Sequence, residues 1–223
     1  MKSIVVTIDG PAGAGKTTVS KRLAKALGYR YVDTGALYRG VAFEANAAGI
    51  HADDDEGLKT LCEKLDLKLV LSEQGLRLLS GGHDISEDIR TPAMSMMASA
   101  VSARPVVRAY LLGLQRKLAM EKGVVFEGRD MGTVVFPEAE MKFYLDASPE
   151  VRAYRRYLEL KDSKAVTLEQ VETDLRKRDE NDSSRALAPL KPADDAVKID
   201  ATPIQVDDVI QTMMNHIKSK ISE

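Results

Sequence analysis

The chain has 223 residues, 44% of them hydrophobic and 30% charged, a composition typical of a soluble globular protein with one core or a core and an insert. The net charge of -2 excludes a protein that coats nucleic acid or an anionic membrane, so anion binding requires a local cluster of basic side chains. The single cysteine, Cys62, excludes an intrachain disulfide, and no run reaches the roughly 18 apolar residues that span a bilayer. We therefore expect a cytoplasmic protein.

Short apolar runs alternate with helical patterns along the chain. This alternation is typical of an α/β protein whose parallel sheet is covered by helices on both faces. The predicted strands are residues 4–8, 31–32, 124–126, 142–145 and 196–199.

The predicted helices carry clear start and stop signals. In chain order, one spans residues 16–27 and ends at Gly28, one runs from Pro105 to near Gly123, one opens at Ser148-Pro149-Glu150, one opens with a capping box of Thr167 and Gln170, and the last opens at Thr202-Pro203 with Gln205.

Residues 66–80 interrupt this alternation. Their apolar residues recur with period two on either side of Glu73-Gln74-Gly75, a pattern that predicts a β-hairpin. Antiparallel strands within an α/β chain indicate an inserted subdomain, which we place at residues 38–100. Residues 1–37 and 101–223 then form the core domain, and the polar run 51–56 is expected to be a solvated loop.

A glycine-rich segment follows the first predicted strand and opens the first predicted helix. It matches G-x-x-x-x-G-K-[ST], in which backbone N–H groups and a helix N-terminus bind phosphate. Lys16 can reach the β- and γ-phosphates, and the Thr17 hydroxyl can ligate Mg²⁺. The predicted ATP-binding residues are Gly10, Pro11, Ala12, Gly13, Ala14, Gly15, Lys16, Thr17 and Thr18.

The rest of the sequence narrows the class of phosphate-binding protein. A GTPase switch is excluded, because the chain lacks the Asn-Lys-x-Asp that reads guanine. An ATPase motor stays open, since Glu127 and Asp146 both end apolar strands and either could act on a metal or a water.

Arginines in polar or turn-rich settings favour a kinase with two phosphorylated ligands. Paired guanidinium groups offset the repulsion between two polyanions, and positioning with charge stabilisation can carry the transfer without a strong base. Arg178, Asp182 and Arg185 are spaced to share one helix face, for which a salt-bridged solvent face is the alternative. The candidate arginines are Arg39, Arg108, Arg129, Arg178 and Arg185.

Five segments together resemble one family. IDGPAGAGKTT, DTGALYRGVA, SARPVVR, FEGRDMGTVVFP and RKRDENDSSRALAPLKPA occur in this order, as in bacterial cytidylate kinases. The resemblance implies a three-layer P-loop fold with a central parallel sheet, an inserted monophosphate-binding subdomain with a small antiparallel sheet, and a short lid near residues 153–165. Arg155 and Arg156 would face the ATP phosphates. The alternative for them and for Arg152 is surface pairing with Glu150 or Glu159.

The resemblance also implies roles for individual residues. Thr34, Arg39 and Arg129 would hold the CMP phosphate, while Ser99, Arg108 and Asp130 would read the edge of cytosine. Arg178, Asp182 and Arg185 would hold sugar and phosphate, and Asp33 would join Thr17 at Mg²⁺. The implied catalytic residues are Lys16, Arg129, Arg155, Arg156 and Arg185.

The expected activity is phosphoryl transfer from ATP to CMP and dCMP in a monomer without nucleic-acid or membrane partners. Two alternatives stay open, a kinase of another nucleoside monophosphate such as UMP and a non-catalytic nucleotide-sensing module. Glu127 and Thr34 stand where the family often has Asp and Ser, which leaves the detailed geometry of the site open.

Overall fold

The computed structural model describes residues 3–72, 75–161 and 166–222. The chain divides into two compact units. Unit 1 comprises Met1–Tyr31 and Glu121–Glu223, and unit 2 comprises Val32–Met120. The boundaries of an inserted subdomain at residues 38 and 100 stay a prediction.

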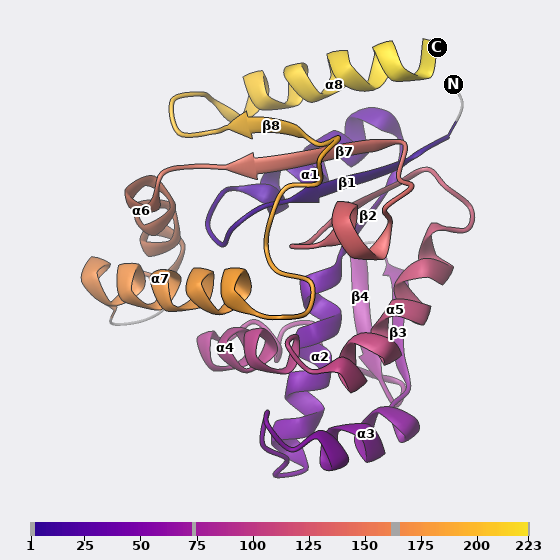
Figure 1. The fold of residues 1–223 in the computed structure, drawn as a ribbon, viewed down its shortest axis with the longest axis vertical. Helices are drawn as coiled ribbons and strands as arrows, with labels where there is room; N and C mark the ends of the chain where they lie inside the picture. Colours follow the sequence, from indigo (N-terminus) through magenta and orange to yellow (C-terminus); the bar gives the residue numbers. More distant parts are fainter. Residues whose placement is uncertain (1–2, 73–74, 162–165, 223) are drawn as a thin grey trace. The chain divides into compact units, whose positions relative to one another are not determined.

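The sheet of unit 1 has five strands in the order β2-β6-β1-β7-β8, which confirms the predicted α/β class (Figure 1). Strand β1 pairs in parallel with β6 and with β7, and β7 pairs in parallel with β8. The central strand β1 is buried along its whole length. The strands are β1 (Val5–Asp9), β2 (Arg30–Asp33), β6 (Val124–Glu127), β7 (Met141–Asp146) and β8 (Val197–Asp200).

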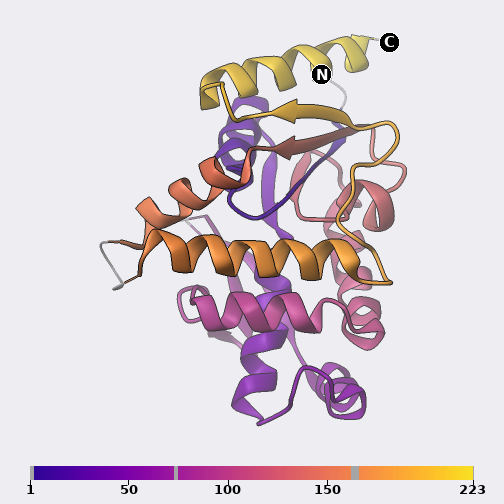
Figure 2. The ribbon, with the colours of Figure 1, turned by 60° about the vertical axis from the view of Figure 1, so that its left-hand side comes forward.

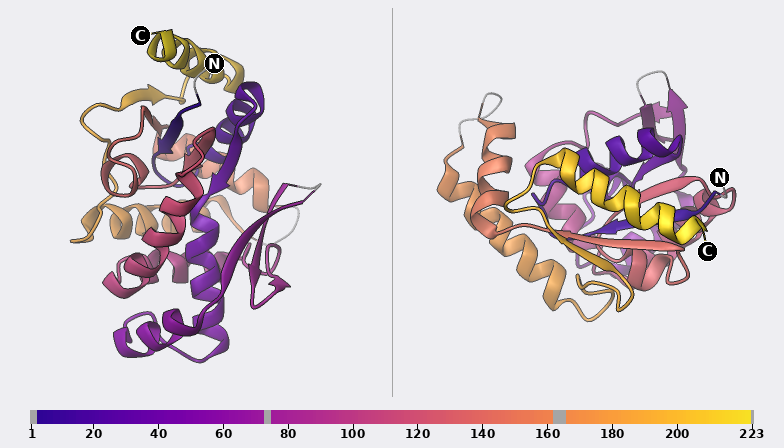
Figure 3. Two further views of the ribbon diagram at one scale, coloured as in Figure 1. Left: turned by 90° about the vertical axis from the view of Figure 1, so that its right-hand side faces the viewer. Right: turned by 90° about the horizontal axis from the view of Figure 1, so that it is seen from above.

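The two faces of this sheet are covered differently. Helices α1 (Lys16–Leu27) and α8 (Val206–Ser222) pack together on one face (Figure 3). Val6 and Ile8 of β1 belong to the main apolar core on this face. Thr7 points to the opposite face, because successive side chains of a strand alternate. There it lies against the short π-helix η1 (Met131–Val135).

Helices α6 (Pro149–Leu160) and α7 (Leu168–Ser184) lie side by side in unit 1 (Figure 2). The Ser148 hydroxyl caps α6, and Thr167 and Gln170 form the predicted capping box of α7. The first part of the predicted lid, residues 153–160, belongs to α6. Residues 162–165, at the end of the predicted lid, lie outside the described residues.

The predicted start of the last helix was wrong. α8 begins at Val206, four residues after Thr202. The Thr202 hydroxyl instead accepts a hydrogen bond of 2.8 Å from the backbone N–H of Ser148, so it is not available as the helix cap. A distant segment therefore overrides a local signal.

Unit 2 is built around α2 (Thr34–Ala47). Its elements α3 (Asp55–Lys64), α4 (Pro92–Val101) and α5 (Pro105–Ala119) surround one apolar core, to which Leu37 and Val41 of α2 contribute. Strands β3 (Leu67–Ser72) and β4 (Gly75–Ser80) form the predicted hairpin, and β5 (His83–Asp84) adds a third antiparallel strand. The turn residues 73–74 lie outside the described residues.

The polar run 51–56 was predicted to be a solvated loop, but its last two residues are helical. Asp54 is the N-cap of α3, and its carboxylate accepts a hydrogen bond of 2.9 Å from the backbone N–H of Gly57. Asp55 and Glu56 then occupy the first helical turn, where acidic side chains interact favourably with the helix dipole.

Candidate active site

The loop from Gly10 to Gly15 joins β1 to α1 in a conformation that needs glycine. Gly10 has a φ of 148°, and a Cβ atom there would lie 1.9 Å from the carbonyl oxygen of Leu145. Gly15 has a φ of 91° and is the N-cap of α1, with no side chain to cap the helix. The first N–H groups of α1 are therefore available to an anion, as the motif predicted.

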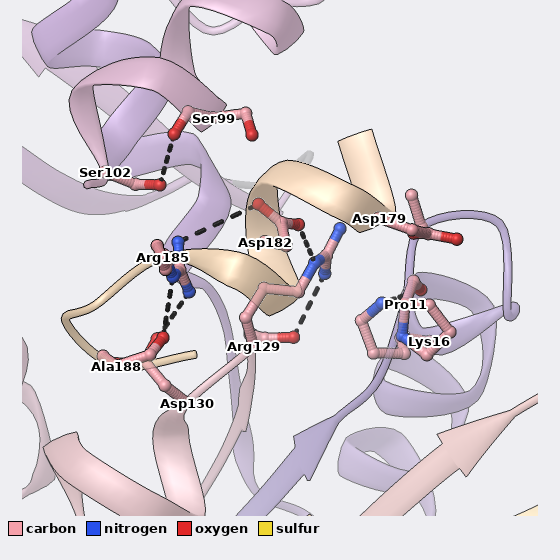
Figure 4. Close-up of polar contacts among 12 residues, drawn as sticks. Pro11, Lys16, Ser99, Ser102, Arg129, Asp130, Asp179, Asp182, Arg185 and Ala188 are labelled. Carbon is pink, nitrogen blue, oxygen red and sulfur yellow. Dashed lines mark hydrogen bonds and ion pairs between the residues drawn. The ribbon is translucent and has the colours of Figure 1, made fainter. Parts of the chain in front are cut away.

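Lys16 is buried at the start of α1, with 5% of the residue exposed. Its Nζ donates a hydrogen bond of 2.6 Å to the carbonyl oxygen of Pro11, which folds the side chain back over the loop (Figure 4). Burial and the positive charge of Arg129 hold the pKa of Lys16 well below its usual range, against the opposing effect of Glu127. A cation in this setting is poised to gain from the arrival of an anionic ligand.

Thr17 belongs to a chain of three side chains. Its hydroxyl donates to Oε1 of Glu127 over 2.8 Å, and the hydroxyl of Tyr31 donates to Oε2 of Glu127 over 2.7 Å. Glu127 ends β6, and Tyr31 comes from β2. The structure thus gives Glu127, whose role the sequence left open, a position beside Thr17. Tyr31 was missed, because a tyrosine within a strand gives no signal of its own.

Asp9 is the last residue of β1, at the same edge of the sheet as Glu127, and nothing in the sequence singled it out. It is 3% exposed, and its carboxylate accepts from the backbone N–H groups of Met131 at 2.9 Å and Gly132 at 2.7 Å. These are the first residues of η1, directly after Arg129-Asp130. Asp9 therefore fixes the segment that carries two of the predicted CMP-binding residues.

Burial raises the pKa of Asp9 from 3.8 to about 6, although the two backbone hydrogen bonds and nearby Lys16 oppose the rise. The folded protein then holds this proton more tightly than the unfolded chain, so the stabilising effect is complete below the ordinary pKa and is lost as the pH rises through 6. We expect the unfolding free energy, relative to Asp9→Asn, to fall by up to about 3 kcal/mol between pH 4 and 7. Urea unfolding at several pH values measures this difference. Exposed Asp208→Asn on α8 is the control, and a flat difference would contradict the prediction.

A cluster of guanidinium groups surrounds Asp182 near the end of α7 (Figure 4). Nε of Arg129 lies 3.0 Å from Oδ2 of Asp182, and Nη1 of Arg185 lies 3.8 Å from Oδ1. Nη2 of Arg185 is also 3.9 Å from Oδ1 of Asp130. The side chains of Asp182 and Arg185 are 4% and 5% exposed, so the alternative of a salt-bridged solvent face is wrong.

The predicted helix face is only partly correct. Arg178 and Asp182 lie on α7, but Arg185 follows the helix with extended backbone angles of −64° and 140°. Its Nε donates a hydrogen bond of 2.7 Å to the carbonyl oxygen of Ala188, which turns the side chain back toward Asp182. Burial alone would raise the pKa of Asp182, but Arg129, Arg178 and Arg185 together lower it below its ordinary value.

The remaining predicted CMP-binding residues lie in unit 2, as does Asp33, which was predicted for the Mg²⁺ site. Asp33 caps α2 by accepting from the N–H of Ala36, and its other oxygen accepts from Arg39 over 2.6 Å. Thr34 and Ser99 are 1% and 7% exposed. Arg108 donates to the carbonyl oxygen of Ser102 over 3.2 Å, and its guanidinium lies 5.9 Å from the centre of the Tyr38 ring.

The three arginines of α6 differ from one another. Arg156 pairs with Glu159 over 2.7 Å, as the surface alternative predicted. Arg155 donates to the carbonyl oxygens of Ala14 at 3.4 Å and Ala201 at 2.8 Å. Arg152 is buried and contacts the phosphate loop, so surface pairing was wrong for this residue.

The family model and the sequence relatives agree on a single family. The family model described as cytidylate kinase matches residues 6–219. The chain belongs to the cytidylate kinase family. A cytidylate kinase from Geobacter sp. (strain M21) is 47% identical over 221 residues, which cover 99% of this chain and 95% of the relative.

Solved structures support the fold. A chain described as an uncharacterized protein from Eubacterium ventriosum ATCC 27560 has a TM-score of 0.55 at 15% identity, with 98% of this chain and 99% of that chain covered. A gluconokinase from Sinorhizobium meliloti 1021 has a TM-score of 0.50 at 14% identity, with 99% and 95% covered. At such identities the likeness concerns the fold alone. It agrees with the P-loop architecture of the cytidylate kinase family.

Proposed function

We propose that the chain transfers the γ-phosphoryl group of ATP to CMP and dCMP, giving ADP and CDP or dCDP. The observation that carries the proposal is the placement of Lys16 and the guanidinium cluster in one unit, with Arg129 and Arg178 close enough to lower the pKa of Lys16. A protein that binds ATP alone has little need of so much positive charge next to its phosphate loop. Two polyanionic ligands offset it.

In this mechanism the protein supplies positioning and charge. The loop from Gly10 to Gly15 and the N-terminus of α1 bind the phosphates of ATP, with Thr18 on the first turn. Lys16 neutralises charge at the β- and γ-phosphates, and Arg129 and Arg185 neutralise charge at the acceptor phosphate. The attacking oxygen is already anionic, so a general base is not required.

The side chains next to the loop fit Mg²⁺ as the companion of ATP. Thr17 and Glu127 offer hard oxygen atoms in hydrogen-bond contact, and Mg²⁺ prefers such donors together with phosphate oxygens. The structure shows no cluster of three or more His, Cys, Asp or Glu for a metal among its described residues. We propose that Thr17 holds the ion with the phosphates, that Asp33 and Glu127 orient its surroundings, and that the ion supplies charge neutralisation.

The base specificity rests on Ser99, Arg108 and Asp130. A carboxylate can accept from the N4 amino group of cytosine, and an arginine can donate to N3 and O2. Uracil reverses this pattern at positions 3 and 4 and would leave buried polar groups unpaired. Asp130 is 2% exposed, so such a mismatch would be costly at this residue.

A panel of CMP, dCMP, UMP and AMP with ATP and Mg²⁺, measured as ADP release, tests the proposed function. We expect CMP and dCMP to be used and UMP and AMP to be used poorly. Equal turnover of UMP and CMP would overturn the cytosine assignment, and ATP binding without CMP-dependent ADP release would indicate a nucleotide sensor instead.

Asp130→Asn is expected to reduce kcat/KM for CMP by about 100-fold while the affinity for ATP changes less than about threefold. The amide replaces one of the two acceptor oxygens with a donor and removes the negative charge, so the site can no longer accept from both the N4 amino group and a neighbouring donor such as Arg185. The control is Asp194→Asn, an exposed carboxylate in the same unit. Equal losses for both nucleotides would show that Asp130 acts on the fold.

We further propose that residues 153–165 act as a lid over ATP, that Arg155 and Arg156 contact its phosphates, and that the protein works as a cytoplasmic monomer on small-molecule substrates. Within residues 3–72, 75–161 and 166–222, no helix has the length and apolar character to cross a membrane.

A further inference from the structure

Arg152 lies in the first turn of α6 and is held by three acceptors. Its side chain is 8% exposed. Nε donates to the carbonyl oxygen of Ala147 at 2.9 Å, and Nη1 donates to the carbonyl oxygen of Ala12 at 3.0 Å and to Oδ2 of Asp179 at 2.5 Å. One buried cation therefore links α6, the phosphate loop and α7.

The hydrogen bond from Arg152 to the carbonyl oxygen of Ala12 affects the orientation of the peptide group between Ala12 and Gly13. The C=O and N–H of a trans peptide point in opposite directions. Because Arg152 holds the carbonyl of Ala12, the N–H of Gly13 is directed away from α6. The loop also lies directly against the helix, since a Cβ atom on Gly13 would be 2.9 Å from the carbonyl oxygen of Arg152. The direction of the Gly13 N–H, one of the N–H groups of the phosphate loop, thus depends on Arg152.

The loop and the two helices also share apolar packing. Ala12 belongs to a small buried cluster with Ala153 of α6 and with Val171 and Leu175 of α7. This packing holds the three segments together without Arg152. The polar contacts of Arg152 therefore set orientation on a base that the apolar cluster already supplies.

At α7, Asp179 stands next to the guanidinium cluster. Arg178 precedes it in the chain, and Asp182, which pairs with Arg129, follows one helical turn later. Oδ1 of Asp179 is buried and has no hydrogen-bond partner in the part of the chain that the structure describes. The link from Arg152 to α7 therefore depends on the single oxygen Oδ2 of Asp179.

We propose that Arg152 is a positioning residue that orients the phosphate loop and, through Asp179, couples that loop to the anion-binding end of α7. Occupation of the loop by a triphosphate fixes Arg152, and Arg152 fixes the turn of α7 that carries Arg178 and Asp182. Each ligand then favours binding of the other. The coupling rests on the proposed function, because the second ligand is taken to be CMP.

The experiment measures the dissociation constant of Mg²⁺–AMP-PNP by calorimetry, with and without saturating CMP. For the unmodified protein, we expect CMP to tighten AMP-PNP binding at least about fivefold. In Asp179→Asn, AMP-PNP alone should bind within about twofold of normal, but the tightening by CMP should fall below about twofold. In Arg152→Lys, which cannot reproduce the forked contacts, AMP-PNP alone should bind about tenfold more weakly.

The matched controls are Glu180→Gln and Arg176→Lys, which make the same changes at exposed positions of α7 and should keep both affinity and coupling. Full coupling in Asp179→Asn, or no coupling in the unmodified protein with CMP bound, would overturn the link to α7. Normal AMP-PNP affinity in Arg152→Lys would overturn the orienting role. Absence of CMP binding to the unmodified protein would refute the proposed function itself, and the AMP-PNP titrations of Arg152→Lys would still decide the role of Arg152 at the loop.

Discussion

Lys16→Met should reduce the rate of phosphoryl transfer by at least about 100- to 1,000-fold, the range found when a charge-stabilising donor is removed from an active site. The fold should survive the change. Lys16 is buried, and burial and Arg129 disfavour its charged form. Replacing the lysine with an apolar residue of similar length removes this unfavourable burial of charge and so stabilises the fold. Loss of the hydrogen bond to the Pro11 carbonyl opposes that stabilisation. We therefore expect the unfolding free energy to change by no more than about 1 kcal/mol.

Single-turnover transfer to CMP and urea unfolding check the two halves of this prediction. The matched control is Lys25→Met, an exposed lysine of α1 that should leave both quantities unchanged. Unfolding of Lys16→Met under native conditions would show that the lysine supports the structure of the loop, and the loss of activity would then say nothing about charge at the phosphates.

Asp182→Asn should lower the unfolding free energy by about 3 kcal/mol, because it leaves buried guanidinium groups without their shared anion. The carboxylate is 4% exposed and lies 3.0 Å from Arg129 and 3.8 Å from Arg185. An amide keeps the shape of the side chain and removes the charge. Transfer to CMP should fall as well, since Arg129 and Arg185 lose the group that holds them.

The pH dependence gives this prediction a second readout. The pKa of Asp182 is lowered in the folded protein, so its contribution to stability is present above the ordinary pKa and is lost as the pH falls through the lowered value. Below about pH 4, the unfolding free energy of the unmodified protein should therefore fall more steeply with decreasing pH than that of Asp182→Asn. Asp174→Asn, exposed on the same helix, is the control. Equal stability of Asp182→Asn and Asp174→Asn would contradict the buried-pair interpretation.

Local chemistry was sufficient to predict most elements of the fold. The capping box of Thr167 and Gln170 opens α7, and Gly28, with a φ of 68°, ends α1 as predicted. The same kind of signal failed at Thr202, because its hydroxyl bonds to Ser148, 54 residues away. A cap signal depends on a polar group that is not engaged elsewhere, and a single sequence does not show distant partners.

The candidate site divides in the same way. The phosphate loop could be predicted because its glycines, lysine and threonine must be contiguous to wrap one anion. Asp9 and Tyr31 could not be predicted. Each acts through a group that the fold brings to it, the N–H groups of Met131 and Gly132 in one case and the carboxylate of Glu127 in the other.

The sequence by itself determined that this protein has a phosphate loop on a parallel sheet and carries the motifs of the cytidylate kinase family, since contiguous residues encode these features. The tertiary structure alone decided where each arginine lies and which groups it contacts. On α6, Arg152 is buried against Ala12 and Asp179, whereas Arg156 pairs at the surface with Glu159. The two side chains are chemically identical. Burial and the nearest carboxylate distinguish them, and both are set by packing between segments that are distant in the chain.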